Sequence, residues 1–388
     1  MKRNLGILII ILTLLTFSFY FQTGSNLAQA NVVTPDYIEE LKLFSRAIGA
    51  ILEGYVIDLR PRQLLYSAVK GMLTGLDPYS QFIEEDNYSL LKIDMSGEYS
   101  GIGAVLEMVG EVVAIKEIQP DSAAHEAGLL VGDQFLKIDG ASVKGKTIPD
   151  VAALLRGEEK TPVTVTVWRE AVKKEMVITV IRKKIEILAI NDVRLIGKAI
   201  GYLRIDNFQE HTAEQLQKAI VSLEKEGMKA LIVDLRDNQG GLMTAAISCA
   251  ELFLPGGSGI ISVASKIDVQ RQKHVAPDNK KITDTQLIVL VNERSASASE
   301  IFSASIQDNK RGKIVGVKTF GKASIQSVIP LDETTAFKLT TAQYVTPSGR
   351  LIDGAGVEPD FVVVNGAAGS ENQEAQVEKA LELFKEYM

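Results

Sequence analysis

Apolar residues in the first part of the chain recur with helical spacing. Beyond residue 35, large apolar side chains follow one another at intervals of three and four, as in an amphipathic helix (Leu41, Phe44, Ile48, Ile51). A second stretch of this kind begins at Pro61 and stops at the breakers of GLDPYS, residues 75–80. We therefore predict a helical pair over residues 38–83, within a helical segment that covers residues 31–95.

The pattern changes between residues 96 and 184, where short runs of β-forming residues alternate with turns. Gly, Pro and Asp-Gly separate these runs, and one helical segment, TIPDVAALLRG, interrupts them. We predict a small, mostly-β domain whose strands lie in AVLEMV, EVVAIKEI, QFLKID, TPVTVTVWR and EMVITVIR.

Strand and helix patterns alternate from residue 185 to residue 366. The segments ALIVDLR, LIVLV and KIVGV are apolar at almost every position, and the helical segments between them carry one apolar face. Strands without a polar face are buried on both sides, which is typical of a parallel sheet covered by helices. We predict an α/β core here, followed by a C-terminal helix within residues 367–388.

The chain begins with an arrangement typical of an export signal. Two basic residues precede an apolar run at residues 5–21, and a small-x-small cleavage site follows at residues 28–30. We expect residues 1–30 to be a signal peptide, which places the protein in the periplasm or another extracytoplasmic compartment. An uncleaved membrane anchor is the alternative, because the 17 apolar residues could just span a bilayer.

Composition excludes several classes of site. The 388 residues are 46% hydrophobic and 23% charged, as in an ordinary globular protein, and the net charge of −7 without a basic run argues against nucleic-acid binding. Cys249 is the sole cysteine, so an internal disulfide is excluded. The three histidines, His125, His211 and His274, lack metal-ligand spacing, and we expect neither a metal nor a cofactor.

The segment RSASASEIF, residues 294–302, has two interpretations. Ser297 and Glu300 have the spacing of a capping box at the start of a helix. A helix N-terminus is also a place where backbone N–H groups stabilise a developing oxyanion, so Ser297 could be a nucleophile. The local pattern does not separate the two interpretations.

A serine nucleophile needs a base, and no histidine has a convincing setting at a strand-to-helix turn. Lys322, in KTFGKASIQ at residues 318–326, is the other candidate. A lysine acts as a base only when neutral, which requires its pKa to fall from about 10.4 to near 7, at a cost of about 4 kcal/mol. Its sequence neighbours Phe320, Gly321 and Ala323 carry no acid, which permits such a shift.

These motifs, with Lys322 25 positions after Ser297, resemble those of the C-terminal processing (tail-specific) serine peptidases. The resemblance covers nearly everything after the export signal. It departs from the family pattern in Ala323, where a glycine is usual, and in the VNER that precedes the serines. The other matching motifs follow in chain order (GMLTGLDPYSQFI, YSGIGA, AGLLVGDQFLKIDG, LLRG, DLRDNQGG and TPSGRLIDGAGVEPD).

The resemblance implies a site and a fold. It implies a Ser297–Lys322 dyad, Gln326 orienting the lysine, and an oxyanion hole from the backbone N–H groups of Ala298 and of either Gly240 or Gly241 in DLRDNQGG. It also implies a crotonase-like α/β peptidase core, residues 185–366, into which a PDZ domain, residues 96–184, is inserted. The PDZ loop would bind the carboxylate end of a client chain through Gly101, Ile102, Gly103 and Ala104.

We therefore predict an exported, ATP-independent serine endopeptidase that recognises unstructured protein C-termini. Arg156, at the end of the PDZ helix, is a candidate for communicating peptide occupancy to the core. The terminal helices at 38–83 and 375–388 would pair subunits into a homodimer, and an activating adaptor is a further candidate partner. Two alternatives are a non-catalytic PDZ adaptor on a peptidase scaffold and an acyl-transfer or hydratase enzyme on the related α/β fold.

Overall fold

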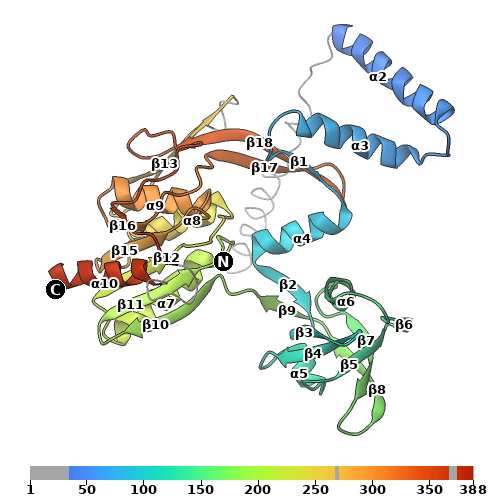
Figure 1. The fold of residues 1–388 in the computed structure, drawn as a ribbon, viewed down its shortest axis with the longest axis horizontal. Coiled ribbons are helices and arrows are strands. Elements are labelled where there is room, and N and C mark those ends of the chain that lie inside the picture. Colours follow the sequence, from blue (N-terminus) through green and yellow to red (C-terminus); the bar gives the residue numbers. More distant parts are fainter. Residues whose placement is uncertain (1–34, 267–270, 367–373, 388) are drawn as a thin grey trace, which may run out of the picture. The chain divides into compact units, whose positions relative to one another are not determined.

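The computed structural model describes residues 35–266, 271–366 and 374–387 (Figure 1). The predicted export signal, residues 1–30, lies outside the described residues. Within the described part of the chain, no helix combines the length and the apolar character needed to cross a membrane. The chain divides into two compact units, and the first consists of Met1–Leu90, Val263–Gln272 and Ser324–Tyr344.

The first unit contains the two N-terminal helices that the apolar spacing predicts. They are α2 (Pro35–Gly54) and α3 (Pro61–Thr74), and the short strand β1 (Gln81–Ile83) follows them. The predicted helical pair corresponds to α2 and α3, while the end of the predicted range is a loop at residues 75–80 followed by the strand β1. Large apolar side chains along α2, such as Leu41, Phe44 and Ile51, remain exposed to solvent.

A five-stranded sheet, here called the arm, joins strands that are far apart in sequence. Strand β1 pairs with β18 (Ala336–Val345), which also pairs with β17 (Ser324–Pro330). Beyond β18 come β13 (Gly259–Ser265) and β14 (Gln272–Val275). The sequence pattern did not reveal this arm, because its strands are half-buried and carry a mixed polar and apolar sequence.

The second unit begins with a small β domain at the position that the sequence predicts. Helix α4 (Glu85–Ser96) leads into β2 (Glu98–Gly101), which pairs with β9 (Lys183–Glu186) where the domain ends. The main sheet has the order β3-β4-β5-β7-β8, and β6 pairs with β5. Its strands are β3 (Ala104–Val109), β4 (Val112–Ile118), β5 (Gln134–Ile138), β6 (Ala141–Ser142), β7 (Pro162–Arg169) and β8 (Lys174–Ile181).

Two helices complete this β domain. They are α5 (Ala123–Glu126) and α6 (Ile148–Leu155), and α6 starts at a capping box formed by Thr147 and Asp150. The apolar core of the domain extends in sequence from Ile102 to Val180. The five predicted strand segments correspond to β3, β4, β5, β7 and β8, whereas β2, β6 and β9 were not predicted.

The α/β core is a largely parallel sheet with the order β10-β11-β12-β15-β16-β19. All its neighbouring strands are parallel except β10 and β11, which form an antiparallel pair. The strands are β10 (Ile190–Ile196), β11 (Ile200–Ile205), β12 (Ala230–Asp234), β15 (Gln286–Val291), β16 (Lys313–Gly316) and β19 (Phe361–Val362). Strand β12 is buried at every position, as its apolar sequence predicts.

Helices cover both faces of this sheet. Leu383 and Phe384 of α10 (Ala375–Tyr387) pack against alternate residues of the strands, including Tyr202. Leu223 of α7 (Thr212–Lys225) lies against Gly201, which faces the opposite side of β11. The remaining helices are α8 (Met243–Glu251) and α9 (Ala298–Asp308), which contact each other.

The C-terminal helix differs from our expectation. We predict that the segment 375–388 pairs subunits, yet the apolar stripe of α10 packs on the core sheet of the same chain. Ala380, Leu383 and Phe384 are at most 3% exposed. The apolar face of α10 is therefore part of the core, whereas Leu41, Phe44 and Ile51 of α2 stay exposed.

Candidate active site

The serine run lies at the turn between β15 and α9, and its three serines have different surroundings. Ser295 and Ser299 are completely buried, and their hydroxyls donate to the backbone oxygens of Leu235 and Asn238 at 2.8 and 2.9 Å. They hold the run against the DLRDNQGG loop. Ser297 is the one serine of the three with some solvent access.

Ser297 has an unusual backbone conformation. Its φ of 55° and ψ of −112° lie outside the regions that a residue with a Cβ ordinarily adopts. Such a conformation persists only where the surrounding structure enforces it, and it is common at functional sites. As expected from the capping pattern, the Glu300 side chain accepts a hydrogen bond from the Ser297 N–H at 2.8 Å.

Glu300 has a second set of partners that the capping pattern does not predict. One carboxylate oxygen accepts from the backbone N–H groups of Ser297 and Lys322, at 2.8 and 2.9 Å. The other accepts from the Thr319 hydroxyl at 2.5 Å and from the Gly321 N–H at 2.7 Å. The backbone of the predicted nucleophile and that of the predicted base are thus bound by the same side chain.

The Glu300 carboxyl group is fully buried. Burial penalises its charged form and raises its pKa, although its four donors act in the opposite direction. The sequence showed no acid beside Lys322, but the fold brings this one to the Lys322 backbone. The capping-box spacing predicts that Glu300 binds the Ser297 N–H, but it gives no indication of the contact with Lys322.

The segment that carries Lys322 is fixed by its neighbours on several sides. Gly321 has a φ of +89°, and a Cβ there would lie 2.8 Å from the backbone nitrogen of Gly356. The Ala323 N–H donates to the Asp353 carboxylate at 3.0 Å. Both contacts involve the TPSGRLIDGAGVEPD motif, so this motif supports the position of Lys322, which is itself half-buried.

The glycine pair of DLRDNQGG lies beside the serine. Gly240 has a φ of +113°, and a Cβ at Gly240 would lie 2.9 Å from the Ser297 Cβ and 3.0 Å from the Ala298 nitrogen. Gly240, Ser297 and Ala298 are therefore in close contact, and position 240 admits no side chain.

The two glycines differ in how their N–H groups are used. The Gly240 N–H donates to the Asn238 side chain at 2.8 Å. Gly241 forms a parallel bridge with Phe208, in which the Phe208 N–H donates to the Gly240 oxygen and the Leu242 N–H donates to the Phe208 oxygen. In this pattern the N–H of Gly241 faces away from Phe208.

A buried ion pair anchors the start of this glycine loop. Asp234 is fully buried and accepts hydrogen bonds from the Arg236 guanidinium and, at 2.6 Å, from the Tyr202 hydroxyl. Burial and the neighbouring Asp234 carboxylate raise the pKa of Tyr202 to about 12. The glycines make this motif recognisable in the sequence, whereas the ion pair between Asp234 and Arg236 was not predicted.

Gln326 belongs to the other compact unit. Its side-chain nitrogen donates to the hydroxyls of Ser324 and Thr340 at 3.0 and 3.2 Å, next to a register shift between Ile325 and Gln326 in the pairing of β17 with β18. Its predicted role toward Lys322 stays a prediction.

The predicted carboxylate-binding loop lies between β2 and β3. Gly101 ends β2, and Ala104 begins β3. Gly103 has a φ of +76°, and a Cβ there would lie 2.4 Å from the Ser122 Cβ, so the loop needs glycine at this position. The oxygen of Ile102 accepts from the Ala124 N–H at 2.7 Å, which fixes the loop on α5.

Arg156 follows the end of α6, close to this loop. Its guanidinium carbon lies 5.2 Å from the centre of the Tyr99 ring, and the Gly157 N–H donates to the Ser100 oxygen at 3.3 Å. Both partners directly precede the loop in sequence. Arg156 is therefore near the predicted peptide site, while its role in communication stays a prediction.

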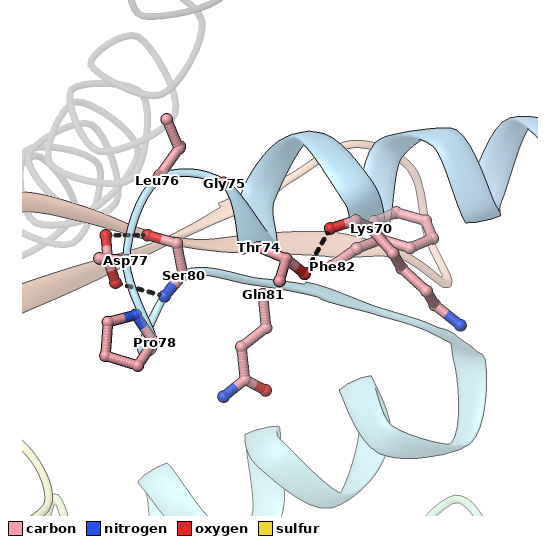
Figure 2. A pocket seen from close by; sticks show the side chains of 9 residues that line it. All are labelled: Lys70, Thr74, Gly75, Leu76, Asp77, Pro78, Ser80, Gln81 and Phe82. Atoms are coloured by element: carbon pink, nitrogen blue, oxygen red, sulfur yellow. Dashed lines mark hydrogen bonds between the residues drawn. The ribbon is translucent and has the colours of Figure 1, made fainter.

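A cavity of about 640 Å³ is lined by residues of the first unit (Figure 2). The GLDPYS loop lines it together with the end of α3 and the start of β1, and Asp77 in this loop accepts hydrogen bonds from the N–H and hydroxyl of Ser80. No predicted site residue lines the cavity. Among the described residues, no cluster of three or more His, Cys, Asp or Glu side chains could hold a metal ion.

Comparisons with known proteins assign two regions of the chain to families. Residues 199–363 match the model of Peptidase family S41, and residues 115–169 match that of the PDZ domain. The carboxy-terminal-processing protease of Bartonella bacilliformis is 36% identical over 84% of this chain and 75% of its own length. A probable CtpA-like serine protease of Staphylococcus haemolyticus is 33% identical over 86% of this chain and 66% of its own length.

A solved structure is also similar in sequence. The photosystem II D1 C-terminal processing protease is 30% identical, with a TM-score of 0.46 over 86% of this chain and 94% of that protein. The chain belongs to the family of carboxy-terminal-processing proteases, which are serine peptidases, and it carries a PDZ domain.

Proposed function

We propose that this chain is an exported, ATP-independent endopeptidase that cleaves client proteins near their C-terminal tails. The observation that carries the proposal is the Glu300 carboxylate, which accepts hydrogen bonds from the backbone N–H groups of both Ser297 and Lys322. The contact brings together two segments that are distant in sequence, at a buried turn where Ser297 alone of the serine run has solvent access.

Ser297 is the nucleophile of the proposed reaction and Lys322, in its neutral form, is the base. Lys322 takes the hydroxyl proton while the Ser297 oxygen attacks the scissile carbonyl carbon. The oxyanion forms against the N–H groups of Ala298 and, in our assignment, Gly241, because the Gly240 N–H already donates to Asn238. The C–N bond then breaks, the leaving amine takes the proton from Lys322, and water hydrolyses the acyl-enzyme.

In the proposed mode of recognition, the C-terminal carboxylate of an unfolded client binds the N–H groups of the loop 101–104. The client then adds as a strand beside β3. Gln326 would orient Lys322, and Arg156 would respond to the bound tail. Export follows from the order of basic, apolar and small residues at positions 1–30. The largely parallel sheet with helices on both faces is compatible with a crotonase-like core.

The experiment compares cleavage of an unfolded protein with an apolar C-terminus by three variants. Ser297→Ala and Lys322→Ala should each lower kcat by at least about 1000-fold, because each removes a reacting group. Lys318→Ala is the matched control: this nearby lysine is half exposed and pairs with Glu358, so cleavage should proceed at the wild-type rate.

Two results would count against the proposal. Undiminished cleavage by Ser297→Ala or Lys322→Ala would exclude the dyad. Tight binding of the client by the wild-type protein without any cleavage would favour the non-catalytic PDZ adaptor.

A further inference from the structure

The segment that follows β11 contacts the glycine loop on one side. The Phe208 N–H donates to the Gly240 oxygen at 2.9 Å, and the Leu242 N–H donates to the Phe208 oxygen at 2.7 Å. These bonds place Phe208 directly against both glycines. The position of the Gly241 N–H therefore depends on where the segment 207–211 is held.

The same segment contacts the end of α4 on its other side. The Asn207 side-chain nitrogen donates to the Asp94 carboxylate at 3.0 Å, and the Glu210 N–H donates to the Met95 oxygen at 3.1 Å. Residues 94–98, here called the joint, lead directly into β2, which ends at the predicted peptide loop. The segment 207–211 thus connects the joint with the glycine pair.

Asn207 is the residue whose side chain contacts both ends of this connection. Its oxygen accepts from the Phe208 N–H at 2.9 Å and lies so close to Gly241 that a Cβ there would be 2.6 Å away. Its nitrogen donates to Asp94. A single planar amide thus links the joint to the backbone that presents the Gly241 N–H.

We propose that Asn207 is a positioning residue, which holds the Gly241 N–H in place for the oxyanion by linking Asp94 to the bridge between Phe208 and Gly241. This inference rests on the proposed function, because it assigns a purpose to the same oxyanion hole. An N–H donor stabilises the oxyanion effectively only when it is held within a fraction of an ångström of its productive position.

The neighbouring Gln209 adds a reason to expect movement at the joint. Its side chain is 5% exposed, and its side-chain oxygen has no hydrogen-bond partner among the described residues. The oxygen faces Gly97, where a Cβ would lie 2.7 Å from it. A buried acceptor without a donor disfavours this arrangement, and hydrogen bonds such as that of Asn207 with Asp94 offset the cost.

The test exchanges the donor and the acceptor of the Asn207–Asp94 contact. Asn207→Asp keeps the oxygen that accepts from Phe208 but places a carboxylate against Asp94. We expect kcat for the unfolded client to fall by between about 10-fold and 100-fold with little change in KM. The double variant Asp94→Asn with Asn207→Asp restores the hydrogen bond in the reverse direction, and kcat should recover.

Asp94→Asn alone is the matched control. Its amide oxygen can still accept from Asn207, so kcat should stay near the wild-type value. A merely structural role for Asn207 would lower thermal stability without separating kcat from KM. An Asn207→Asp variant with wild-type kcat, or a double variant no more active than Asn207→Asp, would overturn the proposal.

A second measurement does not depend on catalysis. Hydrogen exchange of the Phe208 and Leu242 backbone amides should be faster in Asn207→Asp than in the wild type, and normal in the double variant. Unchanged exchange would refute the positioning role even in an active enzyme. If the proposed peptidase function is wrong, the wild-type protein itself will not cleave the client, which distinguishes that outcome from a wrong role for Asn207.

Discussion

Glu300 caps its own helix and at the same time binds a segment that is distant in sequence. At the start of α9 it binds the Ser297 N–H, as any N3 glutamate in a capping box would. Through the same carboxylate it binds three donors of the segment 319–322. A buried carboxylate is tolerated only with such partners, and here they fix the relative position of two predicted reacting groups.

Replacement of Glu300 by glutamine should remove the contribution of this buried carboxyl group to the pH dependence of stability. Because its pKa is raised above the ordinary 4.5, the folded state holds the proton more tightly than the unfolded state. Wild-type stability therefore falls as the pH rises through the window that starts near 4.5, and the variant lacks this fall. We expect Glu300→Gln to be less stable by about 1–3 kcal/mol, with the difference largest at low pH.

Denaturant unfolding at a series of pH values measures this difference. Glu293→Gln is the matched control: its side chain is exposed, and the change should stay within about 0.5 kcal/mol at every pH. A difference between wild type and Glu300→Gln that grows with pH would contradict the assigned direction of the pKa shift.

At the scale of elements, the loop between β2 and β3 depends on one glycine. Gly103 combines a φ of +76° with close contact to Ser122, and the backbone on both sides is fixed by β2 and by α5. We predict that a client carboxylate binds the N–H groups of this loop, since glycine places no side chain at this position.

Gly103→Ala should therefore weaken binding of a peptide with a free C-terminus by at least about 10-fold, since the added methyl group displaces the loop. Fluorescence anisotropy of a labelled apolar peptide measures the affinity, and the C-terminally amidated peptide should bind poorly to the wild type. Gly110→Ala is the control, because Gly110 has a φ of +64° but open space around it. Equal affinity of Gly103→Ala and wild type would exclude this loop as the carboxylate site.

At the scale of the molecule, helices α2 and α10 differ in whether their apolar stripes are covered. Helix α10 covers one face of the core sheet, whereas α2 leaves Leu41, Phe44 and Ile51 at least 40% exposed. A continuous apolar stripe in water is costly, and a second copy of the same stripe would cover it. We therefore retain the homodimer as a prediction, and assign it to the N-terminal helices alone.

The double substitution Leu41→Glu and Phe44→Glu should convert a dimer into a monomer, because charged side chains would face each other across the contact. Sedimentation equilibrium measures the mass of each form. Arg46→Glu is the control, since Arg46 lies two positions beyond Phe44 and so on another side of α2. A wild-type protein that is monomeric at micromolar concentration would exclude the predicted dimer.

The sequence alone determined the elements whose patterns are strong. Buried strands such as 230–234 and amphipathic helices such as 212–225 lie where their apolar spacing places them. The paired glycines and the serine run also identified the loops of the candidate site. Local periodicity and turn chemistry are properties of short segments, so they can be recognised without knowledge of the rest of the fold.

Only the tertiary structure decided which residues meet. The capping-box spacing singled out Ser297, but only the fold shows that Ser295 and Ser299 are buried while Ser297 keeps some solvent access. The approach of Glu300 to Lys322, and of Asn207 to Asp94, joins segments far apart in sequence. Such contacts follow from the packing of whole elements, which fixes side-chain neighbours that no single segment specifies.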